Sequence, residues 1–261
     1  MTQHKIYIGT AGWVLPPQVR NRFVGEGTNL EKYSRFLNAA EINSSFYRDH
    51  KPETYRKWAE MVPSDFRFSI KLNKYFTHEK KLTEAGDKLK ETIDGILELR
   101  DKFGTLLIQL PKSLEFNRHV ADHFFKELRH VYEGEVVIEP RSRTWTSREA
   151  ANLLTSFSIN KVLADPEPCR MPKDLRQQVE FITYFRLHGS PDMYKSSYTP
   201  EVLDRIAQQI SKTYSLGSTV WCIFDNSTFG HATENALDLS FMLENGLSFV
   251  PREQLRIHAP H

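Results

Sequence analysis

Short apolar segments recur at fairly even intervals along the chain, and polar stretches separate them. Several segments are continuous rather than alternating, for example Leu106–Ile108 and Val136–Ile138. Continuous apolar runs of this length are typical of parallel strands that are covered on both faces. We predict eight strands, over Lys5–Ile8, Ala40–Asn43, Arg67–Lys71, Thr105–Leu110, Val136–Glu139, Lys161–Ala164, Phe181–Leu187 and Thr219–Phe224.

Amphipathic helical patterns lie between most of the predicted strands. The clearest covers Asp87–Phe103, where Leu89, Ile93 and Ile96 begin a wide apolar stripe. The sixth connection, Pro166–Val179, carries three prolines and is predicted to be only partly helical. The other predicted helices are Leu30–Leu37, Pro52–Met61, Val120–Leu128, Ser147–Thr155, Val202–Tyr214 and Thr233–Leu243.

The repeated alternation of strand and helix favours an α/β fold of the (β/α)8, TIM-barrel type, with an irregular sixth unit. A doubly wound open sheet is the main competing fold. The 261 residues fit one barrel of roughly 250 residues or two small domains. Because no linker, low-complexity tract or change of composition interrupts the chain, we predict a single domain over residues 1–261.

Composition narrows the class of protein. Hydrophobic residues make up 39% and charged residues 26%, which is ordinary for a globular protein. The net charge of +2 argues against a strongly electrostatic nucleic-acid binder. Two cysteines give no disulfide framework, and no apolar stretch approaches the roughly 20 residues of a membrane helix. We therefore predict a cytoplasmic protein without a membrane partner, and leave its oligomeric state open.

Polar residues follow nearly every predicted strand. Active residues of a parallel barrel lie where its strands end and the following loops begin. One ion pair at a strand end is usually structural, so the prediction of one shared polar pocket depends on the repetition. The candidate residues are Trp13, Glu41, Asn43, Lys71, His78, Gln109, Glu139, Arg141, Arg186, His188, Asn226 and His231.

Residues two apart on a strand point to the same face of the sheet. This parity groups Glu41 with Asn43, Glu139 with Arg141, and Arg186 with His188. If each pair points inward, acidic and basic groups alternate around one rim. Such pairing is needed there, because an unpaired buried charge costs several kcal/mol.

Seven motifs, in order over almost the whole chain, also match a known pattern. They are Gly9-Thr10-Ala11-Gly12-Trp13, Glu41-Ile42-Asn43-Ser44-Ser45-Phe46-Tyr47, Phe66-Arg67-Phe68-Ser69-Ile70-Lys71, Thr77-His78, Gln109-Leu110-Pro111, Arg186-Leu187-His188-Gly189, and Gly230-His231-Ala232 with Asn235. With these motifs the chain resembles the YecE-like proteins, domain of unknown function family 72. The resemblance implies a TIM-type barrel and a cytoplasmic, mainly bacterial protein. It implies no activity, because the family is named for lacking one.

The chain departs from the usual pattern of that family at three positions. Ala11 stands where many members have Ser, and Ser142 follows Arg141 where a His is usual. Asp225 precedes Asn226 where two Asn are usual, which adds a negative charge near the predicted pocket. No role that requires the missing His is carried over to this chain.

An enzyme that binds a small anionic, phosphate-bearing substrate is our first hypothesis, with a hydrolase or an isomerase/lyase as the reaction class. Barrels often hold phosphate in the loops after strands 7 and 8. The catalytic candidates are Glu139 and Glu41 as acid/base groups, Lys71 as an electrophile or charge stabiliser, and His188. The substrate-binding candidates are Asn43, His78, Gln109, Arg141, Arg186, Asn226, His231 and Trp13.

Two other hypotheses remain. The barrels of xylose isomerase and endonuclease IV are similar in fold and suggest a metal-dependent hydrolase or isomerase, but the chain lacks His-x-His or comparable ligand spacing. Interleaved basic and aromatic residues at 71–81 suggest a non-catalytic nucleic-acid-binding module, although a solvated loop explains them more simply. We expect no metal ligands and no cofactor.

Overall fold

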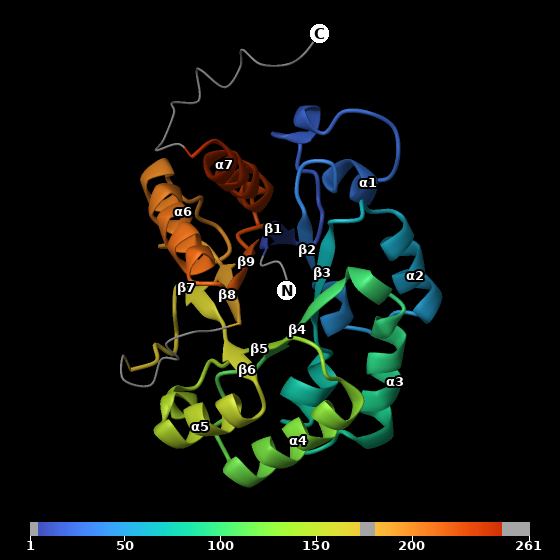
Figure 1. The fold of residues 1–261 in the computed structure, drawn as a ribbon, viewed down its shortest axis with the longest axis vertical. Coiled ribbons are helices and arrows are strands. Elements are labelled where there is room, and N and C mark those ends of the chain that lie inside the picture. The colour runs from blue at the N-terminus through green and yellow to red at the C-terminus, as the bar shows by residue number, and fades with distance from the viewer. Residues whose placement is uncertain (1–4, 173–180, 247–261) are drawn as a thin grey trace.

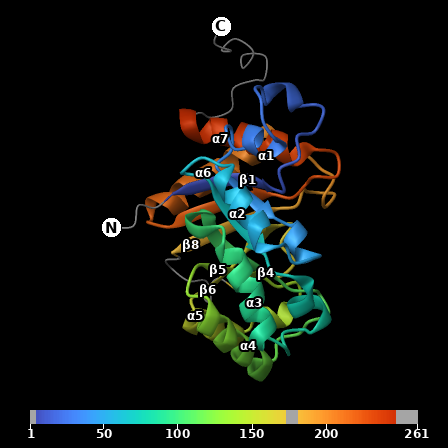
Figure 2. The ribbon, with the colours of Figure 1, turned by 90° about the vertical axis from the view of Figure 1, so that its right-hand side faces the viewer.

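The computed structural model describes residues 5–172 and 181–246 of the chain. The strands of these residues form one sheet, in the order β6-β5-β4-β3-β2-β1-β9-β8-β7, and every neighbouring pair is parallel. The sheet curves into a nearly closed barrel with helices around it (Figures 1 and 2), which confirms the predicted single-domain α/β barrel. The strands are β1 (Ile6–Ala11), β2 (Ala39–Ile42), β3 (Arg67–Lys71), β4 (Phe103–Gln109), β5 (Val136–Glu139), β6 (Ile159–Lys161), β7 (Leu163–Asp165), β8 (Ile182–Leu187) and β9 (Thr219–Phe224).

The sixth predicted strand, Lys161–Ala164, is in fact two short strands with a change of partner between them. β6 pairs with β5, whereas β7 pairs with β8. Between them, the backbone N–H of Val162 donates to the carbonyl of Ile138 at 2.8 Å. The ladder of hydrogen bonds is interrupted at Val162, because the residues before it pair with β5 and the residues after it pair with β8. This segment brings the two ends of the sheet together.

The helices mostly confirm the apolar periodicity. The predicted helix Asp87–Phe103 is too long, because it ends at Leu97 and is followed by a 3-10 turn, Arg100–Lys102. Arg100 has a φ of 53°, which is outside the helical region, and Phe103 already begins β4. The helices are α1 (Asn29–Tyr33), α2 (Pro52–Glu60), α3 (Gly86–Leu97), α4 (Arg118–Val131), α5 (Arg148–Ser156), α6 (Pro200–Ser215) and α7 (His231–Asn245).

The sixth unit is irregular in the residues that can be described. Residues 166–172 form no helix, and the rest of the predicted, partly helical connection Pro166–Val179 lies outside the described residues. A cavity of about 680 Å³ lies on the outer side of the barrel there, lined by side chains of α5, α6 and the strands β6 to β8. Its lining includes Asp165 at the end of β7 but none of the candidate residues predicted for the strand-end pocket.

Two apolar cores hold the barrel. The larger packs the outer faces of the strands against the helices. The smaller fills the interior and includes Tyr7, Leu107, Val137, Tyr184 and Trp221. The Trp221 ring lies 4.6 Å from that of Tyr7 and 5.9 Å from that of Tyr184, between ring centroids. Because apolar side chains fill this end of the interior, the inward-pointing polar side chains gather at the carboxyl ends of the strands.

Candidate functional site

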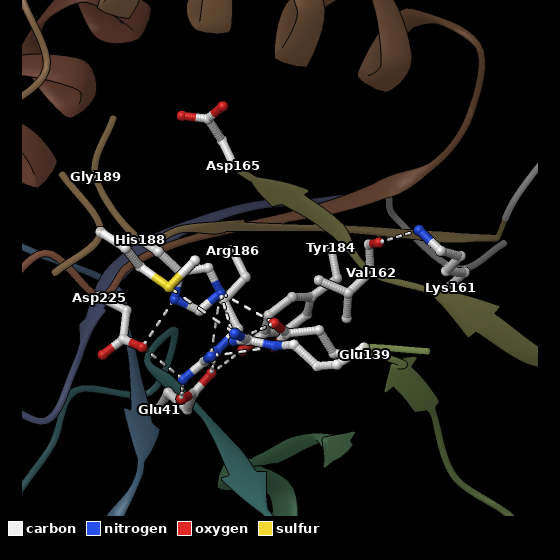
Figure 3. Close-up of polar contacts among 12 residues, drawn as sticks. Glu41, Glu139, Lys161, Val162, Asp165, Tyr184, Arg186, His188, Gly189 and Asp225 are labelled. Carbon is white, nitrogen blue, oxygen red and sulfur yellow. Dashed lines mark hydrogen bonds and ion pairs between the residues drawn. The ribbon is translucent and has the colours of Figure 1, made fainter. Parts of the chain in front are cut away.

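Arg186 lies at the centre of the polar cluster, and its donors are occupied by carboxylates. Its Nε and Nη2 donate to Glu41 Oε2 and Oε1 at 3.0 and 2.7 Å, and its Nη1 donates to Glu139 Oε2 at 3.1 Å. Asp225 Oδ2 lies 3.0 Å from Nη2. The carboxylates come from β2, β5 and the residue after β9, so one guanidinium on β8 joins strands from around the barrel (Figure 3).

His188 is held between two carboxylates of the same cluster. Its Nε2 lies 3.0 Å from Glu139 Oε1, and its Nδ1 lies 3.1 Å from Asp225 Oδ2. An ionised carboxylate only accepts hydrogen bonds, so a carboxylate at each ring nitrogen favours the doubly protonated imidazolium form. Burial lowers the pKa of His188, but the hydrogen bonds to Asp225 and Glu139 raise it by a larger amount, so the net shift is upward.

Arg141 completes the cluster from the loop after β5. Its Nη2 donates to Glu139 Oε1 at 2.8 Å, while its buried Nε has no hydrogen-bond partner among the described residues. The cations Arg141, Arg186 and His188 thus face three carboxylates, and the charges balance. Burial raises the pKa of Glu139, but Arg186, His188 and Arg141 outweigh it and hold the pKa below its usual range.

Parity on the strands explains which side chains reach the cluster. The predicted same-face pairs Glu139 with Arg141 and Arg186 with His188 both converge there. Tyr184, two residues before Arg186, points to the same face, although the sequence reasoning missed it. Its hydroxyl donates to Glu41 Oε2 at 2.9 Å and lies 2.9 Å from Ser69 Oγ. The same two-residue spacing could have identified Tyr184.

Lys71 is the last residue of β3 and lies beside the cluster without joining it. Its Nζ lies 4.2 Å from the centroid of the Phe46 ring. Burial and the charge of Arg186 lower the pKa of Lys71 to about 8, although Glu41, Asp225 and Glu139 oppose this shift. Lys71 is therefore a buried amine whose positive charge is disfavoured.

His78 and Gln109 flank this side of the site. His78 lies on a π-helical turn after β3, where its Nδ1 is 2.8 Å from Thr77 Oγ1 and its ring packs against Phe46. Burial lowers the pKa of His78, and the charges of Lys71 and Arg141 lower it further, so the ring is neutral at pH 7. Gln109 ends β4 and pairs in register with Glu139, so the two residues share the inner face.

Four more predicted residues also lie outside the contacts of the cluster. Trp13 packs edge-on against Trp58, 5.2 Å between centroids, and lines a separate cavity of about 480 Å³. Asn226 donates from Nδ2 to Ser196 O and Asn235 Oδ1, both at 2.9 Å. Asn43 begins a 3-10 turn after β2, and His231 begins α7. Buried atoms without a hydrogen-bond partner among the described residues include Asn43 Oδ1, Asn226 Oδ1 and His231 Nδ1.

The loop after β8 covers the cluster. The backbone N–H of Tyr194 donates to His188 O at 2.5 Å, and the two rings lie edge to face at 5.4 Å. Arg141 Nη1 lies 3.9 Å from the sulfur of Met193. In Figure 3, Asp165 lies apart from the cluster, and its Oδ2 instead accepts a hydrogen bond from the hydroxyl of Tyr198 at 2.8 Å.

The carboxylates of the site are arranged around cations. Within residues 5–172 and 181–246, no group of three or more His, Cys, Asp or Glu side chains is arranged to hold a metal ion. Arg186 explains this, because its guanidinium lies between the three carboxylates. No helix in this described part of the chain is long and apolar enough to cross a membrane.

Comparison with known sequences identifies the family. The model of the family described as "Protein of unknown function DUF72" matches residues 7–255. The chain belongs to this family. The UPF0759 protein YecE of Escherichia coli (strain K12) is 34% identical over 167 residues, which are 62% of this chain and 60% of that protein. The UPF0759 protein YunF of Bacillus subtilis (strain 168) is 22% identical over 96% of this chain and 99% of its own length.

Solved structures of DUF72 proteins share the barrel. A family member from Enterococcus faecalis superimposes with a TM-score of 0.74 at 18% identity, covering 94% of this chain and 97% of that one. Another from Thermotoga maritima gives a TM-score of 0.72 at 22% identity, covering 92% and 100%. The resemblance noted in the sequence is therefore confirmed for family and fold.

The three departures from the usual DUF72 pattern differ in their place in the structure. Asp225 is part of the cluster and holds both Arg186 and His188. Ser142 lies instead on the loop after β5, where its Oγ is 3.0 Å from Thr144 Oγ1. Ala11 packs against the interior apolar core. Of the three, only the added negative charge of Asp225 enters the polar cluster.

Proposed function

We propose that this DUF72 protein is an enzyme that binds a small anionic, phosphate-bearing substrate beside the charge cluster. The observation that carries the proposal is a balanced, buried network of three carboxylates and three cations at the carboxyl ends of the strands. Active sites of TIM barrels lie at this end. Burying so many charges is costly, and strongly coupled titratable groups are characteristic of functional sites.

The anion would contact the β3 and β5 side of the site. Arg186 is poorly placed as the first anion ligand, because Glu41, Glu139 and Asp225 already occupy its donors. The Lys71 amine forms no hydrogen bond or ion pair within the described parts of the chain, and Arg141 retains a buried, unpartnered Nε. This differs from our expectation that the loops after strands 7 and 8 would bind the phosphate.

The expected catalytic residues then have different roles. Glu41 and Glu139 position Arg186, Arg141 and His188, and the lowered pKa of Glu139 makes it a poor base at neutral pH. Lys71 faces the substrate. His188 would act as a general acid only if a substrate oxygen replaced one of its two carboxylates as hydrogen-bond acceptor. The reaction classes that fit these groups are proton-transfer reactions of a hydrolase or an isomerase/lyase on a phosphorylated compound.

Binding of inorganic phosphate and of phosphorylated sugars, measured by calorimetry and by turnover, tests this proposal. Arg141→Gln should weaken phosphate binding by about 10- to 100-fold, since a charge-assisted hydrogen bond contributes about 1.5–3 kcal/mol. Arg118→Gln is the matched control, because Arg118 is exposed and pairs with Glu149 at the surface, 3.5 Å away. Equal binding by the wild type and Arg141→Gln would overturn the proposed site, and no binding of any phosphate compound would overturn the substrate class.

A further inference from the structure

Lys71 differs from the other cations at the carboxyl end of the barrel. Arg186, Arg141 and His188 each have a carboxylate within 3.1 Å. The side-chain amine of Lys71 has no hydrogen bond or ion pair among the residues the structure describes, although the residue is only 7% exposed. Unlike the fully buried polar atoms that lack a partner, its Nζ keeps some exposure to solvent. The amine is therefore nearly enclosed, unpaired and still accessible at its tip.

The backbone around Lys71 holds this arrangement in place. Ser45 Oγ lies 2.7 Å from both Lys71 O and Ile42 O, so it joins the ends of β2 and β3. Ser45 belongs to the 3-10 turn Ser44–Phe46, and the next residue presents its ring to the ammonium group. On β3, Lys71 points to the same face as Ser69, which contacts the hydroxyl of Tyr184. The amine is thus directed to the cluster by its strand and by a rigid turn.

The burial of Lys71 favours a neutral amine more than water does. Its pKa is lowered to about 8 by burial and by Arg186, against the opposing charges of Glu41, Asp225 and Glu139. At pH 7 about a tenth of such amines are unprotonated, compared with fewer than one in a thousand for an ordinary lysine. Desolvation and a neighbouring cation are the two ways in which proteins activate lysine as a nucleophile.

We propose that Lys71 forms an imine with the carbonyl carbon of an anionic aldehyde or ketone. This inference rests on the proposed function, because Arg141 would hold the anionic group of the same substrate. The Nζ lone pair bonds to the carbonyl carbon, and the carbonyl oxygen takes up a proton. The resulting carbinolamine loses that oxygen as water. One amine and one carbonyl give one imine and one water, so no oxidant or reductant is needed.

His78 is the neighbouring group that can move the proton in this step. Its ring packs on the same Phe46 side chain that lies under the Lys71 ammonium, with 4.9 Å between ring centroids. Thr77 holds its Nδ1, and the lowered pKa keeps the ring neutral. A neutral imidazole can accept the proton that the amine loses on attack.

Reductive trapping of the whole protein tests the proposal. The protein is treated with glyoxylate, an anionic aldehyde, and sodium cyanoborohydride at pH 7.5, and peptides are mapped by mass spectrometry. Lys71 should be modified about tenfold faster than the exposed lysines, since a larger neutral fraction outweighs its lower basicity. Lys74→Arg is the matched control, because Lys74 lies three residues away, is partly exposed and pairs with Glu79 at 3.1 Å. It should leave the labelling unchanged, whereas Lys71→Arg should abolish the fast phase.

The outcomes separate this inference from the proposed function. Arg141→Gln should slow labelling of Lys71 by glyoxylate but leave labelling by neutral acetaldehyde unchanged. If Lys71 reacts no faster than Lys74 while phosphate still binds, the imine is overturned and the proposed anion site stands. If Lys71 reacts fast with both aldehydes and phosphate does not bind, the nucleophile stands and the anionic substrate is overturned. Far-ultraviolet circular dichroism of each variant confirms that it is folded.

Discussion

The two sides of the polar site differ in how their cations are satisfied. On the β8 side, Arg186 contacts three carboxylates and His188 contacts two. On the β3 side, Lys71 packs on the Phe46 ring and has no carboxylate partner among the described residues. A saturated cation holds the barrel together, whereas an unsaturated one still has donors for a ligand. The difference suggests that the β8 side is the support and the β3 side is the reactive face.

Removing the central guanidinium should have the largest effect on stability. Arg186→Met leaves three buried carboxylates without their main partner, and breaking a buried ion pair from one side costs about 3–5 kcal/mol. We expect a loss of that size in the free energy of unfolding in urea. Arg118→Met, at an exposed pair, should change it by less than about 0.5 kcal/mol. A loss below about 1 kcal/mol for Arg186→Met would show that the cluster does not support the fold.

A pH titration of stability measures the contribution of His188. The pKa of His188 is raised in the folded protein, so the imidazolium stabilises the fold fully below the unfolded value of 6.5. That stabilisation is lost as the pH rises through the higher, folded pKa. His188→Gln should therefore flatten the decline in the free energy of unfolding above pH 6.5. The lowered pKa values of Asp225 and Glu139 predict a separate loss of stability at acid pH. If the free energy of unfolding of His188→Gln declines above pH 6.5 as steeply as that of the wild type, His188 is not a stabilising imidazolium.

Replacing the lysine should have the smallest effect on stability and sharpens the contrast. The lowered pKa of Lys71 means that its charge is less stable in the folded than in the unfolded protein, so the charge destabilises the fold at neutral pH. Lys71→Met removes this charge and retains a chain that packs on Phe46, so the free energy of unfolding should stay constant or rise. Phosphate binding should weaken at the same time. A large destabilisation by Lys71→Met would place Lys71 in the supporting cluster instead.

Much of the barrel could be predicted because local rules govern it. Continuous apolar runs located β5 and β9 with correct bounds, since parallel strands buried on both faces are largely apolar. Parity on β5 and β8 predicted the pairs Glu139 with Arg141 and Arg186 with His188. The break at Val162 had no such local signal, because it results from a change of partner strand.

The alternating strands and helices and the polar residues that end the strands could be predicted from the sequence, because they follow from spacing along the chain. The tertiary structure settles which charges meet. It placed Arg186 among three carboxylates, set Lys71 on an aromatic ring and moved Trp13 to a separate cavity. The reason is physical. Pairing and desolvation depend on distances between strands far apart in sequence, and these two effects decide whether a cation supports the fold or remains free to react.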